Sequence, residues 1–181
     1  MLLERTKIRE FIHKVIKALF SENTSKAISK YFEEGNNIFF RYISSQVIDA
    51  IIIGITSAII LWAVDVKYAV LLALMIGIMK LIPILGSMLS TTIVTLITAV
   101  SGNTAQAIWI FIILIIIHQI DVRFIKPRLA TGLPKLSPVL IIFAIVTFGA
   151  YYGAFGMFLA LPVAAVLKIM LNDFIQSRVE E

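Results

Sequence analysis

The chain has 181 residues, of which 60% are hydrophobic and 15% charged, with a mean hydropathy of +0.98. A water-soluble domain of this length does not carry so many apolar side chains, so the composition excludes that class and predicts an integral membrane protein. The net charge is +5, and eight of the sixteen Lys and Arg residues precede Val47. A basic segment beside anionic lipid explains this distribution better than nucleic-acid binding, and the lack of cysteine excludes disulfides and thiolate metal sites.

Residues 1–43 are predicted to form amphipathic helices on the cytoplasmic side or in the headgroup plane. Between residues 4 and 20 the apolar side chains recur on one helical face, and basic side chains occupy the remainder. The same spacing resumes from Ala27 to Tyr42. We therefore expect a second helix that runs directly into the membrane.

Residues 44–172 are predicted to be a transmembrane domain, followed by a polar cytoplasmic tail at 173–181. In chain order the domain consists of a span at 44–64, a broken run at 68–100, a span at 104–125 and a second broken run at 138–171. Gln46 and Asp49 stand one helical turn apart at the entrance of the first span. A gate or ion site is one interpretation, and an interfacial position where water solvates the charge is the simpler one.

The run from Tyr68 to Val100 organises the rest of the chain. Its 33 residues exceed the roughly 20 that one upright helix needs to cross a bilayer, yet they are too few for two crossings. Pro83 removes a backbone donor and Gly86 adopts conformations closed to other residues, so we expect two half-helices. Irregular backbone at membrane depth survives only inside protein or beside a watery cavity, which points to a transport site.

Hydroxyl side chains form a stripe along one face of the second half-helix: Ser87, Thr91, Thr95 and Thr98. Such a stripe either permits close helix packing or lines a solute path, with Ser87 capping the half-helix at its positive end. Lys80 precedes the break by one turn. Near mid-membrane its ammonium group would need a partner, whereas near either face it would reach water.

Polar residues also gather where the second span ends, at His118, Gln119, Asp121 and Arg123. Residues three and four apart share a helix face, so His118 is expected to meet Asp121, and Gln119 to meet Arg123. A proton relay and a plain interfacial cluster remain equal interpretations.

The loop that follows is basic and contains three prolines, which predicts a cytoplasmic connection. The second 33-residue run, Val139 to Leu171, is weakened near its centre by glycines. A shift of seventy residues places Gly86 on Gly156, which suggests a repeat of span plus broken segment. The helix breaks predicted in this half of the chain are Pro127, Gly149, Gly153, Gly156 and Pro162.

The fold class predicted from these patterns is an all-α, polytopic helical membrane protein. Its two Pro- and Gly-broken segments are either re-entrant hairpins or pairs of crossings. In both schemes the basic stretches share one face, and only Lys67 falls opposite, so the positive-inside rule places both termini in the cytoplasm. The hairpin scheme puts the two broken segments on opposite membrane faces, as inverted repeats do.

Short motifs of proline, glycine and polar residues follow one another in a set order along the chain. They are Ile82-Pro83-Ile84-Leu85-Gly86, then Gln119-Ile120-Asp121 with Pro127 and Gly132, then Pro138, Gly149, Gly153, Gly156 and Leu161-Pro162. In this order and spacing, over about residues 40–168, the chain resembles the autoinducer-2 exporter-like family of bacterial permeases.

The resemblance implies export of a small solute, autoinducer-2 in named members and sodium–proton exchange in others, by a homo-oligomer in the bacterial inner membrane. Family members are usually much longer and open with further spans, so this chain resembles a C-terminal half that is either a fragment or a subunit with a partner chain. Arg123 stands where the family commonly has asparagine.

Three functions follow from these patterns. The first is a secondary, ATP-independent exporter of a small polar solute, with Lys80, Pro83, Gly86, the hydroxyl stripe, Gln119, Asp121 and Arg123 along its path. The second is a sodium–proton antiporter using Asp49, Asp121 or His118. The third is a non-transporting subunit or scaffold that binds a partner chain. No zinc, nucleophile-elbow or phosphate-loop motif occurs, so we expect neither an enzyme nor a cofactor or metal.

Overall fold

The computed structural model describes residues 22–101, 103–129, 134 and 136–179. Over these ranges every regular element is a helix, which confirms the all-α class. In chain order they are α2 (Glu22–Ala63), α3 (Ala69–Met79), α4 (Leu85–Ser101), α5 (Thr104–Ile120), the π-helix η1 (Asp121–Ile125), α6 (Lys126–Leu129) and α7 (Pro138–Val179). The helix predicted for residues 4–20 and the motif residue Gly132 lie outside the described residues.

Three helical stretches are long and apolar enough to cross a membrane: Tyr31–Ala63, Thr104–Leu129 and Pro138–Asp173. The two half-helices between them are shorter, with 11 residues in α3 and 17 in α4. An upright crossing needs about 20 residues, so α3 alone does not reach across. The lengths therefore favour a re-entrant α3–α4 hairpin over two full crossings.

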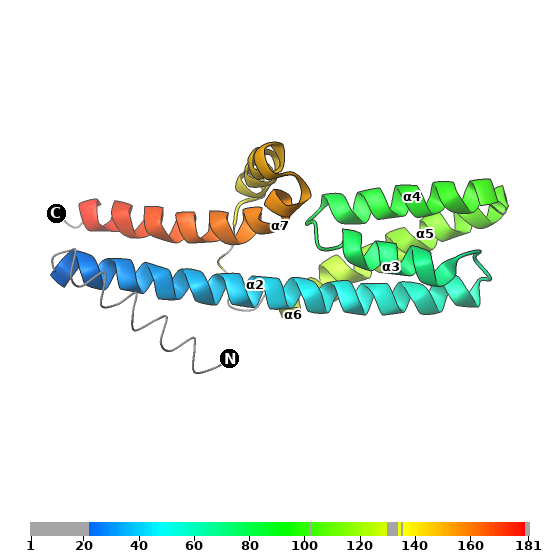
Figure 1. The fold of residues 1–181 in the computed structure, drawn as a ribbon, viewed down its shortest axis with the longest axis horizontal. Helices are drawn as coiled ribbons and strands as arrows, with labels where there is room; N and C mark the ends of the chain where they lie inside the picture. The colour runs from blue at the N-terminus through cyan, green and yellow to red at the C-terminus, as the bar shows by residue number, and fades with distance from the viewer. Residues whose placement is uncertain (1–21, 102, 130–133, 135, 180–181) are drawn as a thin grey trace.

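Helix α2 runs the length of the molecule as one rod of 42 residues, about 63 Å at 1.5 Å per residue (Figure 1). One face of it is buried, through side chains four or seven positions apart: Ile38, Tyr42, Asp49, Ile53, Ser57 and Leu61. The second half of α2 packs in a bundle with α3, α4 and α5. Its first half lies beside the end of α7.

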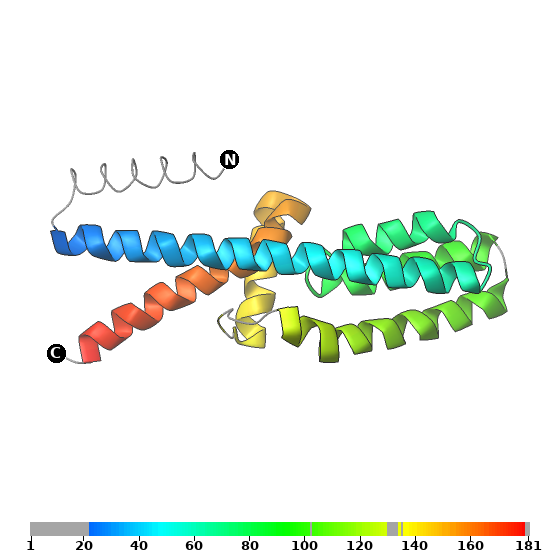
Figure 2. The same cartoon turned by 90° about the horizontal axis from the view of Figure 1, so that it is seen from below.

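In the bundle the chain runs back and forth parallel to α2 (Figures 1 and 2). Helix α3 returns along α2, α4 runs outward again, and α5 comes back against α4. Gly54 and Gly77 let α2 and α3 approach closely, because a Cβ on Gly77 would lie 3.4 Å from the Gly54 Cα. At the far end, Gln106 Nε2 donates to the Val64 carbonyl at 2.8 Å, and Asn103 Oδ1 caps α5.

The first broken segment interrupts its helix between α3 and α4, where Pro83 was expected to end it. Ile84 adopts a left-handed conformation with φ of 64°, which is rare for a β-branched residue. Gly86 is required by close packing, since a Cβ there would lie 1.8 Å from the Met79 carbonyl oxygen. The two half-helices are thus folded back on each other at a tight turn.

The second broken segment bends at Gly153 alone, with φ of 60° and ψ of −145°. The prediction of further breaks at Gly149, Gly156 and Pro162 was wrong, because α7 stays helical through all three. The two glycines instead allow contact across the bend, where a Cβ on Gly149 would meet the side chain of Met157 at 2.7 Å. A buried proline is tolerated where neighbouring helices compensate for its missing donor.

Pro127 does not break its helix either. The chain passes from α5 through the wider turns of η1 into α6 without leaving the helical conformation. The π-helix η1 ends at Ile125, and Pro127 is the second residue of α6, where a proline is tolerated because the amide groups of a first helical turn need no partner within that turn.

The two arms of α7 differ in direction. In Figure 2 the arm before Gly153 crosses the long axis of α2, whereas the arm after it runs back beside the first half of α2. Tyr42 and Phe158 pack with ring centroids 6.0 Å apart. The second broken segment therefore does not repeat the upright α3–α4 hairpin, because its first arm crosses α2, whereas α3 and α4 both run parallel to α2.

Candidate functional site: a buried charge cluster at the hairpin tip

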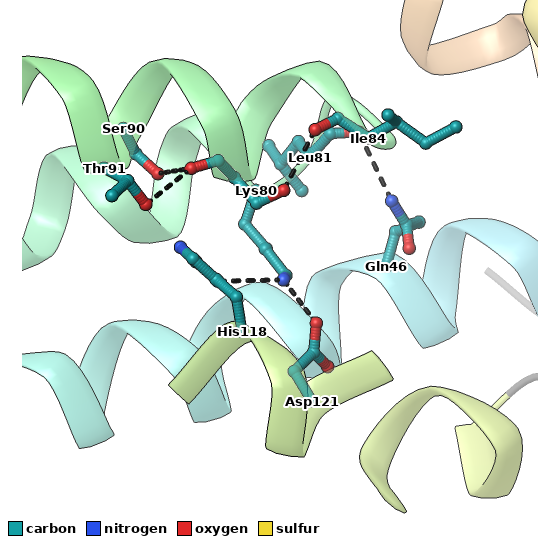
Figure 3. Close-up of polar contacts among 9 residues, drawn as sticks. Gln46, Lys80, Leu81, Ile84, Ser90, Thr91, His118 and Asp121 are labelled. Atoms are coloured by element: carbon teal, nitrogen blue, oxygen red, sulfur yellow. Dashed lines mark hydrogen bonds and ion pairs between the residues drawn. The ribbon is translucent and has the colours of Figure 1, made fainter. Parts of the chain in front are cut away.

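The tip of the α3–α4 hairpin, residues 80–84, ends against the middle of α2 and the end of α5 (Figure 3). Backbone groups at such a break lack helical partners, and one of them is used here, because Gln46 Nε2 donates to the Leu81 carbonyl at 3.4 Å. Pro83 and Gly86 are buried, whereas Ile84 is 48% exposed. The break thus brings polar backbone and the side chain of Lys80 together inside the bundle.

Lys80 forms an ion pair with Asp121, its Nζ donating to Asp121 Oδ2. The side chains are 3% and 0% exposed. The same Nζ lies 3.5 Å from His118 Nδ1, so α5 and η1 present two side chains to one ammonium group. The partner that a membrane-embedded Lys80 would need is therefore Asp121, 41 positions later in the chain.

Asp49 of α2 completes this arrangement from a second side. It is 1% exposed and interacts electrostatically with Asp121, Lys80 and Lys126. Neither of its carboxyl oxygens has a hydrogen-bond partner among the residues that the structure describes. We call Asp49, Lys80, His118, Asp121 and Lys126 the charge cluster.

Of the polar side chains near the end of α5, only some face the charge cluster. Asp121 begins η1 and is buried, whereas the next residues on its outer side are exposed. Gln119 and Arg123, predicted to stand with Asp121 on the solute path, are exposed and not brought to the cluster. Residues two positions apart point to opposite sides of a helix, so Gln119 and Arg123 lie away from Asp121, whereas His118, three positions before Asp121, contacts Lys80 together with it, as the spacing predicted.

The hydroxyl stripe on α4 is largely used by its own backbone. Thr91 Oγ1 donates to the Ser87 carbonyl and Thr98 Oγ1 to the Val94 carbonyl, both at 2.8 Å. Ser87 donates to the Ile84 carbonyl at 2.9 Å and lies two residues inside α4, so its predicted capping role was wrong. Thr95 Oγ1 alone in the stripe is buried without a partner in the described ranges.

A groove of about 440 Å³ between α2 and α3 has a wholly apolar lining. Its lining consists of glycine and alanine residues, among them Gly54, Ala73 and Gly77, and of isoleucine, leucine and valine side chains. Such a surface suits hydrocarbon rather than a polar solute. The members of the charge cluster do not line this groove.

Comparison with known proteins places these features in a family. The family model described as AI-2E family transporter matches residues 1–176. The chain belongs to the AI-2E transporter family. No solved structure matches this AI-2E chain.

Among its relatives, the chain is 26% identical to YrrI of Bacillus subtilis, a candidate transport protein, over 94% of this chain and 48% of YrrI. A candidate transport protein of Thermotoga maritima is 31% identical over 87% of this chain and 46% of its own length. The candidate permease PerM of Escherichia coli is 25% identical over 78% of this chain and 40% of PerM. The chain therefore spans about half the length of the curated relatives it matches, and their names fit a protein that is not an enzyme.

Asp49 and His118 of the charge cluster in this AI-2E chain were predicted as site residues only in the antiporter alternative, and Lys126 was predicted for no site. Asp49 was considered an interfacial residue first, and Lys126 was placed in a cytoplasmic loop. A usable signal existed for Asp49, because it continues the buried face of α2 that carries Tyr42, Ile53 and Ser57 at helical spacing. No such signal exists for Lys126, whose position depends on η1 continuing the helix past Ile120.

Proposed function

We propose that this AI-2E family chain forms the solute-handling half of a membrane transporter that moves a small polar solute without ATP. The observation that carries the proposal is the buried charge cluster at the tip of a broken helix hairpin. Ionisable side chains inside membrane-spanning helices are costly, and they mark solute or ion sites by default. A buried ion pair adds little to stability compared with apolar packing, so stability is a weak reason for its presence.

Free polar atoms supply the binding chemistry. Both oxygens of Asp49, Asp121 Oδ1, His118 Nε2 and Thr95 Oγ1 are buried and lack partners in the described part of the chain. Oxygen acceptors together with a cation suit a compact solute rich in hydroxyl groups, as an autoinducer-2-like molecule is. We assign the path to Lys80, Pro83, Gly86 and Asp121, with Thr95 beside it and with Gln119 and Arg123 at its outer end.

We further propose a bacterial inner membrane location with both termini in the cytoplasm, as the basic N-terminal region favours. Large apolar side chains are exposed on every long helix, for example Trp62, Leu74, Trp109 and Phe143. Lipid covers part of this surface. Further copies of the chain, or a partner chain carrying additional spans, would cover the remainder in an oligomer.

Efflux from proteoliposomes loaded with autoinducer-2 tests this function. We expect Asp121→Asn and Pro83→Ala to lower the efflux rate by about tenfold or more, which corresponds to the loss of one strong interaction. Membrane insertion of both variants should be unchanged. Asp65→Asn, in the exposed connection between α2 and α3, is the matched control and should retain full efflux. Unchanged rates in both test variants would remove the site assignment.

A further inference from the structure

The apolar groove between α2 and α3 takes no part in the charge cluster. Its volume of about 440 Å³ falls within the range of about 300–1,000 Å³ that is typical of pockets for single small molecules. Large side chains of its lining are exposed, among them Ile55 at 57% and Leu74 at 60%, whereas Ala73 of the same lining is 1% exposed. The groove therefore reaches from the surface of the bundle toward its interior.

The length of the groove matches one leaflet of a bilayer. Its lining on α2 runs from Val47 to Ala58, a rise of about 17 Å at 1.5 Å per residue. The hydrocarbon core of a bilayer is about 30 Å thick, so one leaflet contributes about 15 Å. No residue of the lining has a polar side chain. An extended acyl chain fits such a surface, because its methylene groups form no hydrogen bonds.

Exposed aromatic side chains mark the end of the groove at Ala58 and Val70. Trp62 stands one helical turn after Ala58 and is 73% exposed, and Tyr68, two positions before Val70, is 58% exposed. Tryptophan and tyrosine on the surface of membrane proteins gather at the level of the lipid headgroups. This end of the groove, beside the connection between α2 and α3, is therefore at the headgroup level.

A single cation is available at this end. Between residues 42 and 122 the chain has only two Lys or Arg residues, Lys67 and Lys80, and Lys80 is held in the buried ion pair. Lys67 is exposed, its Nζ lies 5.5 Å from the centre of the Tyr68 ring, and it forms no ion pair with any residue that the structure describes. Asp65, the carboxylate nearest in sequence, is exposed as well. An apolar groove that ends beside a lysine has the same order of parts as an anionic lipid.

We propose that the groove binds one acyl chain of an anionic phospholipid, and that Lys67 binds the phosphate of that lipid. The inference does not depend on the proposed transport function. An ammonium group donates charge-assisted hydrogen bonds to phosphate oxygens. An apolar helix of another protein would fill the groove but would leave Lys67 without a counter-charge, whereas the lipid satisfies both.

The lipid would also hold the hairpin against α2. The lining includes Leu81, whose carbonyl accepts the hydrogen bond from Gln46 at the hairpin tip, at the end of the groove opposite Lys67. An acyl chain in the groove contacts α2 and α3 over its whole length, and the apolar area that it buries stabilises their packing. The bound lipid thus acts on the same hairpin whose tip carries Lys80.

Fluorescence quenching by brominated lipids tests the site in reconstituted vesicles. The chain has two tryptophans, so in the Trp109→Phe variant only Trp62, at the end of the groove, reports. Phosphatidylglycerol and phosphatidylcholine, each brominated on the acyl chain, are titrated against unbrominated phosphatidylcholine. We expect about fivefold tighter binding of phosphatidylglycerol at Trp62, which is the contribution of one lysine at an anionic membrane.

Four variants in this background separate the two parts of the site. Lys67→Gln should remove the preference for phosphatidylglycerol, and Lys67→Arg should retain it. Ala58→Phe fills the groove and should reduce quenching of Trp62 by both lipids, whereas Ile59→Phe, an exposed neighbour outside the lining, should not. In a separate Trp62→Phe variant, the remaining Trp109 on α5, which does not line the groove, should be quenched equally by both lipids. Far-ultraviolet circular dichroism verifies that each variant remains helical.

Four results would overturn the lipid site. Equal binding of the two lipids at Trp62 excludes a selective anionic site, and a preference that persists in Lys67→Gln excludes Lys67 as the headgroup partner. A preference that is as strong at Trp109 as at Trp62 indicates general attraction of anionic lipid. The absence of quenching at Trp62 by either lipid means that protein, such as a second copy of this chain, covers the groove.

Discussion

The two broken segments of this chain have the same length and contain the same types of residue, yet they are held in different ways. The break at Pro83 is packed inside the bundle, where Gly86 touches the Met79 backbone and Lys80 is tied to Asp121. The bend at Gly153 lies among exposed aromatic side chains, with Tyr151 80% and Phe155 69% exposed. A Cβ on Gly153 would meet nothing within 4 Å.

The difference shows that a Pro or Gly break in a hydrophobic run can be maintained either by tertiary contacts or by the residue at the bend itself. At Pro83, tertiary contacts impose a strained conformation on Ile84, a residue that does not favour it. At Gly153, the residue itself permits the bend and few contacts enforce it. Strain that surrounding contacts maintain is the feature associated with functional sites, so we assign function to the first break.

The largest effect is expected for Lys80→Met. This variant leaves Asp121 as an unpaired buried charge, which costs about 3–5 kcal/mol in the free energy of unfolding. Lys67→Met is the matched control, because Lys67 is exposed beside the Tyr68 ring, and it should change stability little. Denaturant titration in mixed micelles measures the free energy of unfolding of both variants. Equal stabilities of the two variants would mean that the ion pair does not hold the hairpin tip.

Gly86→Ala should cause the second-largest loss of stability. The added Cβ would lie 1.8 Å from the Met79 carbonyl oxygen, a backbone atom that cannot move away as a side chain could. Overpacking of this severity costs about 3 kcal/mol or more. The same substitution at Gly35 is the control. There the nearest atom is a Val166 methyl group at 3.5 Å, so replacing a mid-helix glycine should be neutral or stabilise by up to about 1 kcal/mol. A tolerated Gly86→Ala would contradict the tight turn.

A pair of exchanges at the two bends should have opposite signs. Gly153→Ala forces a residue with a Cβ into a region reserved for glycine and should destabilise by about 1–3 kcal/mol. Ile84→Gly relieves a left-handed β-branched residue and should stabilise by about 1 kcal/mol. Thermal unfolding of the two variants in the same detergent compares them. If both substitutions shift the unfolding temperature in the same direction, the two bends are not held in different ways.

The smallest effects are expected on the hydroxyl stripe. Thr98→Val removes a side-chain bond to a carbonyl that the helix already engages, and it should cost less than about 1 kcal/mol. Thr95→Val removes a buried hydroxyl without a partner in the described ranges and should be neutral or stabilising. Autoinducer-2 efflux distinguishes the roles: Thr95→Val should slow it, whereas Thr98→Val should not.

The sequence was sufficient for the class of the fold and for the break at Pro83. Composition and run length identify membrane helices, and a proline followed three positions later by glycine is a strong local stop. It was not sufficient for Pro162, Gly149 or Gly156, because a helix surrounded by protein or lipid keeps its conformation through residues that would end it in water. Whether such a residue breaks a helix is decided by its neighbours in space.

The charge cluster was predictable only in part. Lys80 and Asp121 were both singled out, but their pairing depends on how far the hairpin reaches back along α2, which no local spacing encodes. The spacing of three correctly predicted that His118 and Asp121 share a face, since both contact Lys80. Gln119 and Arg123 are each two positions from Asp121, so the helix itself directs them away from it.

The double variant Lys80→Met/Asp121→Leu tests most directly whether the buried ion pair serves transport rather than stability. Apolar replacement of both partners is often neutral or stabilising, so the double variant should regain the stability that Lys80→Met loses. We predict that it remains folded in the membrane and fails to release autoinducer-2 from loaded proteoliposomes. A double variant that is as stable as the unaltered chain and exports autoinducer-2 at the same rate would contradict the assignment of this pair to the transport site.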